Sequence, residues 1–340
     1  MKLAPEPNLH RLDEESTMKA IVRDEYGSTD GLELREVDKP QIGDDDVLVR
    51  VHAAGVDRGV WHVMTGLPYP IRLAGYGFRT PKNPVQGADM AGIVEVAGRD
   101  VTRFRPGDEV FGIAKGSYAE YAIAPENKLA PKPANLTFEQ AAVVAISGLP
   151  ALQGVRDHGK VRPGQKVLII GASGGVGTFA VQIAKSYGAE VTGVCSTSKV
   201  DLVRSLGADH VIDYTHEDFA QQDKRYDVIL DIGGNTSLSR LRRTLTPKGT
   251  LVILGGETDG RWLGGTDRQL RAIVLSRFVG QKLGTFISSE NAEDLLVLKE
   301  LIEAGKVMPA IDRTYALSEV PEAIRYLEAG HVRGKVAITV

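Results

Sequence analysis

Residues 167–199, VLIIGASGGVGTFAVQIAKSYGAEVTGVCSTSK, decide the fold of this chain because they form one uninterrupted βαβ pattern. The short apolar run 167–170 predicts a buried strand, and the glycines after it open a segment whose apolar residues have helical spacing. A second strand is predicted at 191–194. A glycine-rich turn between a strand and a helix is the context in which a dinucleotide pyrophosphate binds. An ordinary βα turn without a ligand is the alternative interpretation.

The glycines of this turn have separate physical roles. Gly174 allows the backbone to approach a pyrophosphate closely, and Gly177 allows the helix to pack tightly on the strand. Ala172 stands where the usual first glycine is found. The N–H groups of the first helical turn attract negative charge, because they lie at the positive end of the helix dipole. The predicted pyrophosphate contacts are Ser173, Gly174, Gly175 and Val176.

The end of the second strand predicts which dinucleotide binds. Cys195 occupies the position where a protein selective for NAD carries Asp or Glu to bond the ribose hydroxyls. Three hydroxyls and an ammonium follow, and these groups suit the 2′-phosphate of NADP through charge-assisted hydrogen bonds. The predicted cofactor is therefore NADPH, bound by Ser196, Thr197, Ser198 and Lys199. In the alternative interpretation, Ser198 caps the next helix and Lys199 is solvated.

The composition indicates a globular protein that acts on a small molecule. The chain has 340 residues, 25% of them charged, and a net charge of -3, so it has no overall attraction to nucleic acid or anionic membranes. No apolar stretch approaches the roughly 20 residues that span a bilayer. A single cysteine excludes an internal disulfide and a thiolate zinc site. We therefore expect a cytoplasmic protein with no nucleic-acid or membrane partner.

The chain divides into two predicted domains. Residues 1–17 are polar and form an N-terminal extension to which we assign no chemistry. Short β-rich runs with frequent turns favour a barrel-like antiparallel domain at 18–139, to which 291–340 return. Residues 140–290 alternate strands and helices, which indicates an α/β fold with a doubly wound parallel sheet of six strands. We place these strands at 167–170, 191–194, 210–212, 227–231, 250–254 and 278–284.

Three further motifs carry a family resemblance: GADMAGIVEVAG (87–98), FRPGDEVFG (104–112) and LGADHVIDY (206–214). With the glycine turn, they make residues 18–340 similar to the medium-chain dehydrogenase/reductase superfamily, within its zinc-independent quinone oxidoreductase group, which includes zeta-crystallin. The resemblance implies a GroES-like antiparallel β-barrel domain, a Rossmann domain and an active site in the cleft between them. It also implies a homodimer in which the Rossmann sheets pair through the strand near 278–284.

The resemblance also shows where related alcohol dehydrogenases bind catalytic zinc. The corresponding positions here are Asp57, Ala88 and Ile146, and the last two side chains have no donor atoms. Zinc takes three protein ligands in catalytic sites, so we expect no metal. Asp89 keeps the carboxylate of the former zinc motif and is assigned a structural role. Without zinc, hydride addition to a quinone or an enone is favoured, because hydrogen-bond donors can stabilise the delocalised oxyanion.

The segment 55–70 lies where the family places its substrate loop. Arg58 is predicted to supply positive charge to a developing enolate, or else to pair with Asp57 on the surface. His62 is a candidate proton relay or a structural histidine. Trp61 and Tyr69 stack on a planar substrate in one interpretation and pack within the domain in the other. The candidate catalytic residues are therefore Asp57, Arg58, Trp61, His62 and Tyr69.

The resemblance implies further cofactor contacts, each of which has core packing as its alternative. These are Tyr214 beside the adenosine phosphate, Leu254 and Gly255 at the end of a strand, and Phe286 near the nicotinamide carboxamide. The predicted function is a zinc-independent, NADPH-dependent oxidoreductase that transfers hydride to quinones or α,β-unsaturated carbonyl compounds. Two alternatives stay open: a metal-free NADP-dependent alcohol or aldehyde oxidoreductase, and a non-catalytic, crystallin-like protein that binds NADPH.

Overall fold

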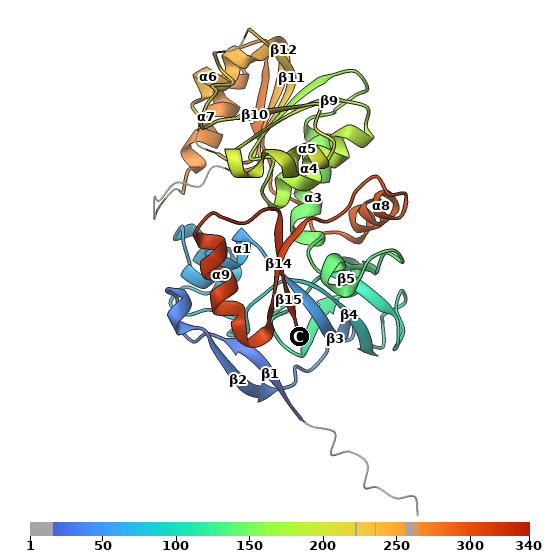
Figure 1. Ribbon diagram of the computed structural model, residues 1–340. Helices are drawn as coiled ribbons and strands as arrows, with labels where there is room; N and C mark the ends of the chain where they lie inside the picture. The colour runs from blue at the N-terminus through green and yellow to red at the C-terminus, as the bar shows by residue number, and fades with distance from the viewer. Residues whose placement is uncertain (1–15, 222, 235, 256–261, 263) are drawn as a thin grey trace, which may run out of the picture.

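A computed structural model describes residues 16–221, 223–234, 236–255, 262 and 264–340, which form two domains (Figure 1). The upper domain in Figure 1 contains a parallel sheet of six strands in the order β10-β9-β8-β11-β12-β13. Its strands are β8 (Lys166–Ile170), β9 (Glu190–Cys195), β10 (His210–Asp213), β11 (Tyr226–Asp231), β12 (Leu245–Ile253) and β13 (Lys282–Thr285). The predicted doubly wound sheet is confirmed, although β12 begins before residue 250 and β13 is shorter than 278–284.

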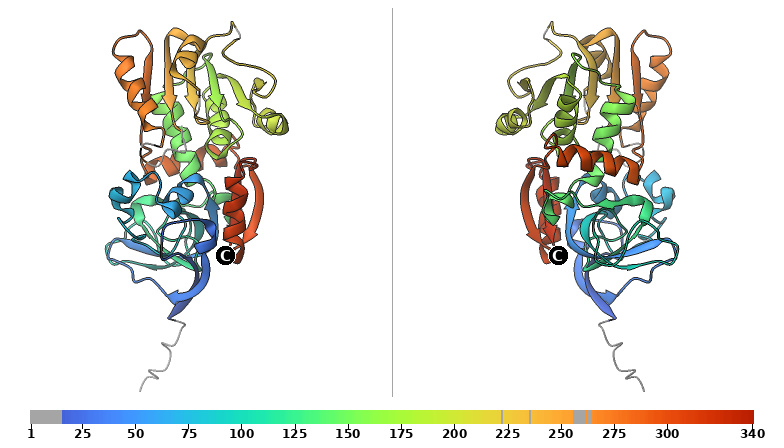
Figure 2. Two further views of the ribbon diagram at one scale, coloured as in Figure 1. Left: turned by 90° about the vertical axis from the view of Figure 1, so that its left-hand side faces the viewer. Right: turned by 90° about the vertical axis from the view of Figure 1, so that its right-hand side faces the viewer.

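This strand order creates the crevice in which open α/β sheets bind their ligands. Strand β8 pairs with both β9 and β11, so the sheet grows in opposite directions from its centre. The carboxyl ends of these strands meet at the point of reversal. Helices cover both faces of the sheet (Figure 2): α4 (Gly175–Ser186), α5 (Val200–Ser205), α6 (Leu238–Thr244), α7 (Thr266–Ser276) and the short η5 (Thr197–Lys199).

Both ends of the chain form the lower domain. Strand β15 pairs with β3 in a sheet of seven strands, so the C-terminal segment lies in the same sheet as β3. The β14 and β15 strands are parallel, so the predicted antiparallel pattern is wrong for this pair. The strands of this domain are β1 (Thr17–Val22), β2 (Glu33–Asp38), β3 (Asp46–Val56), β4 (Asp89–Ala97), β5 (Glu109–Ile113), β6 (Tyr121–Pro125), β7 (Leu129–Pro131), β14 (Ile311–Ala316) and β15 (Lys335–Thr339).

Helical segments complete this domain and join it to the Rossmann domain. They are η1 (Thr29–Gly31), α1 (Arg58–Thr65), η2 (Arg72–Tyr76), η3 (Glu126–Lys128), α2 (Phe138–Ala141), α3 (Ala145–Gln153), η4 (Gly154–His158), α8 (Ala292–Glu303), η6 (Leu317–Glu319) and α9 (Val320–Glu328). The predicted extension 1–17 overlaps β1 at Thr17, and its first 15 residues lie outside the described part. Within the described residues, no helix combines the length and apolar character needed to cross a membrane.

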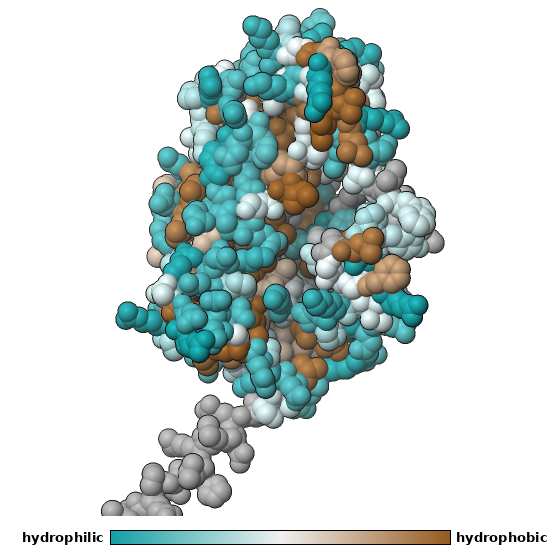
Figure 3. Space-filling view, turned by 180° about the vertical axis from the view of Figure 1, so that it is seen from behind, coloured by the Kyte–Doolittle hydropathy of each residue, from teal (hydrophilic) through white to brown (hydrophobic). Residues whose placement is uncertain are grey.

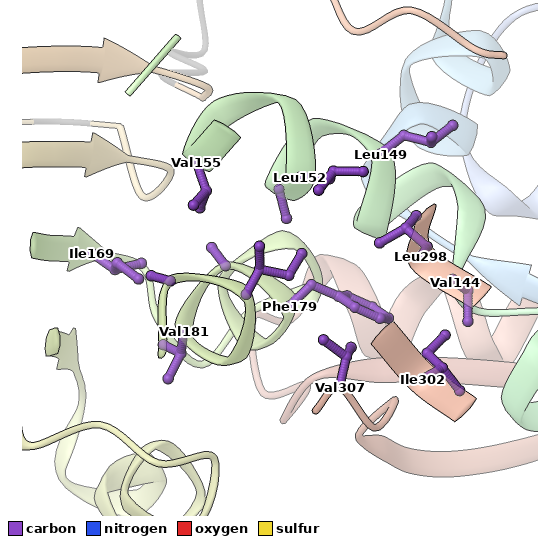
Figure 4. Packing of buried hydrophobic residues seen from close by; sticks show 14 of the residues in the cluster. Val144, Leu149, Leu152, Val155, Ile169, Phe179, Val181, Leu298, Ile302 and Val307 are labelled. Atoms are coloured by element: carbon purple, nitrogen blue, oxygen red, sulfur yellow. The ribbon is translucent and has the colours of Figure 1, made fainter. Parts of the chain in front are cut away.

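The main core joins the two domains through α3, α4 and α8. The fully buried Phe179 of α4 lies beside side chains from the neighbouring helices, including Leu298 and Ile302 of α8 (Figure 4). Burial of an aromatic side chain contributes on the order of 2 kcal/mol relative to exposure. The helix that carries the glycine turn is therefore anchored in a core shared with α3 and α8.

Candidate active site

The glycine turn has the geometry predicted for a phosphate site. Helix α4 begins at Gly175, and its N-cap Gly174 has no side chain to accept from the first-turn N–H groups. Among the described residues, a Cβ atom at Gly174 would meet only the Gly171 oxygen, at 3.6 Å, so the space beside it is open. A Cβ atom at Gly177 would stand 2.1 Å from the same oxygen. Gly174 therefore leaves room for a ligand, whereas Gly177 allows the close packing of helix and strand.

The rest of the turn is held by the domain that contains the seven-stranded sheet, called the catalytic domain below. The carbonyl oxygen of Ser173 accepts a hydrogen bond of 2.9 Å from the N–H of Gly334. A Cβ atom at Gly175 would stand 3.1 Å from the Lys335 side chain. Val176 is half-buried and packs on the main core. The four residues predicted to contact a pyrophosphate thus surround a helix N-terminus that both domains support.

Polar groups meet at the carboxyl ends of β9 and β10. Ser196 is half-buried, Ser198 is exposed, and the Tyr214 side chain is 62% exposed at the end of β10. The Thr197 hydroxyl lies 2.9 Å from the Thr215 hydroxyl. Hydrogen bonds from Thr197, together with Thr215 and His216, keep the pKa of Asp213 well below its usual range. The predicted residues therefore lie at one edge of the sheet, beside a carboxylate that the sequence analysis did not consider.

Lys199 has partners that the sequence did not predict. Its ammonium donates to the carbonyl oxygens of Gly330, at 3.0 Å, and Val332, at 2.8 Å. Burial lowers the pKa of Lys199, the Asp312 carboxylate opposes this shift, and Arg333 makes a smaller contribution that lowers the pKa. An ammonium has three N–H donors, so one donor remains beyond these two bonds. Lys199 thus ties η5 to the loop that precedes β15.

The predicted nicotinamide end is built from closely packed backbone. A Cβ atom at Gly171 would stand 2.8 Å from the Gly233 nitrogen, and one at Gly255 would stand 2.2 Å from the Ile232 oxygen. Leu254 is half-buried and packs on the main core, and Phe286 stacks on His158 with ring centroids 4.0 Å apart. Leu254 and Phe286 therefore pack against neighbouring side chains, as the alternative interpretation expects. Both lie at the edge of the sheet where ligands bind.

Asp57 and Arg58 lie in different surroundings at the start of α1. Asp57 is the N-cap of α1, and its Oδ1 atom accepts from the Val60 N–H at 3.2 Å. Its Oδ2 atom is buried without a hydrogen-bond partner among the described residues. Arg58 is exposed, and its guanidinium lies over the Trp61 ring at 4.7 Å. The sequence thus predicted a polar group here but not its role as a helix cap.

Trp61 and His62 each make a hydrogen bond within their own domain. The Trp61 indole N–H donates to Glu328 of α9 at 2.6 Å. Its ring packs against a buried apolar cluster of the same domain that includes Met64 and Ile324. His62 lies 2.6 Å from the Leu67 carbonyl oxygen through its Nδ1 atom. Tyr69 instead contacts the Rossmann domain, where its ring meets Trp262 edge to face at 5.2 Å. Of these aromatic candidates, Tyr69 extends from the catalytic domain to the other domain.

A buried ion pair lies beneath the glycine turn. The carboxylate of Asp89 accepts from the backbone N–H groups of Ala145 and Ile146 and lies 3.4 Å from the Lys335 ammonium. Burial raises the pKa of Asp89 to about 7, although Lys335 opposes the shift. The predicted structural role of Asp89 fits these contacts. No local pattern indicated Lys335, because its partner Asp89 lies 246 residues away along the chain.

A second buried ion pair, Asp231 with Arg268, was also missed. Asp231 ends β11, and its Oδ2 atom lies 2.6 Å from the Arg268 guanidinium. The burial of Asp231 raises its pKa, and Arg268 opposes this shift. Asp231 ends a predicted strand two residues before the pair Gly233 and Gly234, and this pattern was a visible signal in the sequence. No comparable signal exists for Arg268 on the amphipathic α7.

The donor atoms present do not form a recognisable metal centre. The three positions aligned with zinc ligands carry a capping carboxylate at Asp57 and two apolar side chains. Within the described parts of the chain, no group of three or more His, Cys, Asp or Glu side chains could hold a metal ion.

The site does fit a nicotinamide dinucleotide. The open first turn of α4 would hold the pyrophosphate, the ends of β9 and β10 the adenosine half, and residues 232–234 and 254–255 the nicotinamide half. When bound, that cofactor supplies or accepts a hydride. The fold and this edge together define a two-domain nicotinamide-dependent dehydrogenase or reductase.

Comparison with known proteins places the chain more closely. The family model described as the alcohol dehydrogenase GroES-like domain matches residues 43–134, and the zinc-binding dehydrogenase model matches residues 206–338. The chain belongs to the medium-chain dehydrogenase/reductase superfamily, in its quinone oxidoreductase group. It is an oxidoreductase that uses a nicotinamide cofactor.

Individual relatives match nearly the whole chain. The mitochondrial NAD(P)H oxidoreductase RTN4IP1 of Mus musculus is 35% identical, over 96% of this chain and 90% of its own length. The chloroplastic NADPH-dependent alkenal/one oxidoreductase of Arabidopsis thaliana is 34% identical, over 94% of this chain and 79% of its own. The solved structure of the Coxiella burnetii quinone oxidoreductase has a TM-score of 0.83 and 29% identity, and covers 95% of this chain and 99% of its own.

Proposed function

We propose that this protein is a zinc-independent, NADPH-dependent reductase of α,β-unsaturated carbonyl compounds or quinones. The observation that carries the cofactor choice is the end of β9. Cys195 is buried there, and burial raises its pKa to about 11, so it offers neither a carboxylate nor a thiolate to a ribose diol. Ser196, Ser198, Lys199 and Tyr214 lie around the same strand ends and offer hydroxyl and ammonium donors.

Two positive side chains near the end of β9 also bear on the choice of NADPH. Lys199 and Arg333 repel each other, since Arg333 lowers the pKa of Lys199. A phosphate placed beside two like charges relieves that repulsion, whereas a neutral ribose hydroxyl does not. The carboxylates of Asp213 and Asp312 work against a phosphate. Asp213 accepts hydrogen bonds from Thr197, Thr215 and His216, which partly satisfy its charge. The hydroxyl and ammonium donors after β9, more than the net charge of the site, therefore support NADPH over NADH.

The substrate class follows from the donors near the predicted substrate loop. Reduction of an enone or quinone places charge on a conjugated oxygen, which a hydroxyl or guanidinium can stabilise without a metal. Tyr69 lies where the catalytic domain contacts Trp262, and Arg58 presents an exposed guanidinium on the same loop. We assign Tyr69 to orienting the substrate oxygen. The relatives named as an alkenal/one oxidoreductase and a quinone oxidoreductase support the same class.

A substrate panel tests this proposal. Purified protein is mixed with NADPH or NADH and with short enones, alkenals, benzoquinones, naphthoquinones or saturated aldehydes, and the loss of nicotinamide absorbance is followed. We expect turnover with NADPH and with enones or quinones. Turnover confined to saturated aldehydes would instead support the alcohol or aldehyde oxidoreductase, and tight NADPH binding without any turnover would support the non-catalytic protein.

A further inference from the structure

Arg268 of α7 connects the residues that follow two neighbouring strands. One guanidinium nitrogen donates to the Asp231 carboxylate at 2.6 Å and to the Thr236 carbonyl oxygen at 2.8 Å. The other terminal nitrogen donates to the Gly255 carbonyl oxygen at 3.1 Å. Thr236 follows β11, and Gly255 follows β12. A single side chain thus holds both segments that approach the predicted nicotinamide half.

Asp231 completes the connection from inside the sheet. Its side chain is fully buried, and its Oδ1 atom accepts from the Gly234 N–H at 3.2 Å. Its backbone oxygen accepts from the N–H groups of Leu254, at 2.9 Å, and Gly255, at 3.2 Å. Through these bonds, residues 232–234 and 254–255 share one buried anchor. A buried carboxylate of this kind is costly unless it is paired and hydrogen-bonded.

The geometry requires a guanidinium rather than any positive charge. The three acceptors come from different segments, and a planar fork of N–H donors can reach them together. A lysine ammonium at this position would neutralise Asp231 but would not hold both carbonyl oxygens in the same geometry.

We propose that Arg268 is a positioning residue that fixes the segments after β11 and β12 against the nicotinamide half of the bound cofactor. This inference rests on the proposed function, because it assumes that the dinucleotide lies along this edge of the sheet. Arg268 does not reach the adenosine end, which the residues after β9 and β10 form. Its removal should therefore weaken binding of the whole dinucleotide and spare binding of its adenosine half.

Binding measurements on the full-length protein separate these two halves. The probes are NADPH and adenosine 2′,5′-bisphosphate, which carries the adenosine end without nicotinamide. We expect Arg268→Gln to raise the Kd for NADPH about tenfold, a loss equivalent to one or two good hydrogen bonds. The Kd for the bisphosphate should change less than twofold. Arg268→Lys should lie between Arg268→Gln and the wild type, because it keeps the charge alone.

Two further variants make the test specific. Arg271→Gln is the matched control, because Arg271 lies on the same helix with a 76% exposed side chain that pairs with Asp267 of α7. It should leave both affinities unchanged. The double variant Arg268→Gln with Asp231→Asn removes both charges of the pair. NADPH binding should stay weak in this variant, because the carbonyl oxygens of Thr236 and Gly255 are still not held.

The proposal is overturned by any of three results. The first is an unchanged NADPH affinity in Arg268→Gln. The second is equal weakening of NADPH and bisphosphate binding, which would show general damage to the domain. The third is full recovery of NADPH affinity in the neutral double variant. A failure of this proposal can also be distinguished from a failure of the proposed function. A wild type that binds NADPH but reduces no enone or quinone would contradict the proposed function and leave the role of Arg268 intact.

Discussion

At the scale of single residues, the notable feature is an acidic side chain buried where the two domains meet. Asp89 is fully buried, and burial raises its pKa to about 7 despite the Lys335 ammonium 3.4 Å away. Asp57 adds to this shift through like-charge repulsion. Asp89 is therefore more easily protonated in the folded protein than in the unfolded chain, where its pKa is near 3.8.

This difference predicts a pH dependence of stability. Between about pH 4 and pH 7 the folded state binds a proton that the unfolded state lacks, so the contribution of Asp89 to the free energy of unfolding falls as pH rises through this window. Above pH 7 its contribution is constant. Denaturant unfolding of wild type and Asp89→Asn at several pH values should show the difference between the two changing across this window. Parallel curves would contradict the assignment.

Some residues of the candidate site could be predicted from the sequence, and others could not, for a physical reason. Ser196–Lys199 could be placed because a strand end and a helix start are local patterns. The bonds from Lys199 to Gly330 and Val332, and from Arg268 to Thr236 and Gly255, join segments distant along the chain. No local pattern reports such contacts. The roles of Trp61 and Asp57 in packing and capping were likewise set by tertiary structure.

At the scale of elements, α4 and its turn decide where a phosphate can lie. The space around Gly174 and around Gly177 distinguishes their predicted roles. Gly174 is open, and its φ of -84° suits any residue, whereas Gly177 stands against the backbone of Gly171 and Ala172. This contrast was predictable, because the strand, turn and helix are consecutive in sequence.

Two alanine substitutions should therefore have opposite consequences. Gly177→Ala places a Cβ atom 2.1 Å from the Gly171 oxygen and should lower the free energy of unfolding by about 1–3 kcal/mol, as overpacking does. Gly174→Ala should leave unfolding nearly unchanged but raise the KM for NADPH about tenfold, because its methyl group occupies the space of the phosphate. Thermal unfolding and steady-state kinetics measure both. Normal kinetics in Gly174→Ala would exclude a phosphate at this turn.

At the scale of the whole molecule, the predicted domain boundaries and the homodimer stay predictions. Strand β13 ends the order of the described Rossmann sheet and presents an edge that can pair with another strand. A groove of about 810 Å³ lies between the start of α6 and α7, the helix that packs against β13, and is lined partly by Leu270, Val274 and Phe278. Apolar side chains also gather on the upper, Rossmann part of the face in Figure 3. Exposed apolar patches of this kind indicate protein interfaces.

A charged substitution tests the dimer. Phe278 is 79% exposed at the groove, and Phe278→Glu should convert a dimer into monomers in analytical ultracentrifugation. Leu73→Glu is the control, because Leu73 is 75% exposed on the catalytic domain and should leave the dimer intact. A wild-type protein that sediments as a monomer at micromolar concentration would contradict the predicted pairing.

The central claim is that the groups after β9 select a phosphorylated cofactor. The most direct measurement is the Kd for NADPH and for NADH, by titration of the wild type and of Lys199→Ala. We expect the wild type to bind NADPH at least tenfold more tightly than NADH, and Lys199→Ala to lose most of this preference by weakening NADPH alone. Equal affinities for the two cofactors in the wild type, unchanged in the variant, would contradict the account.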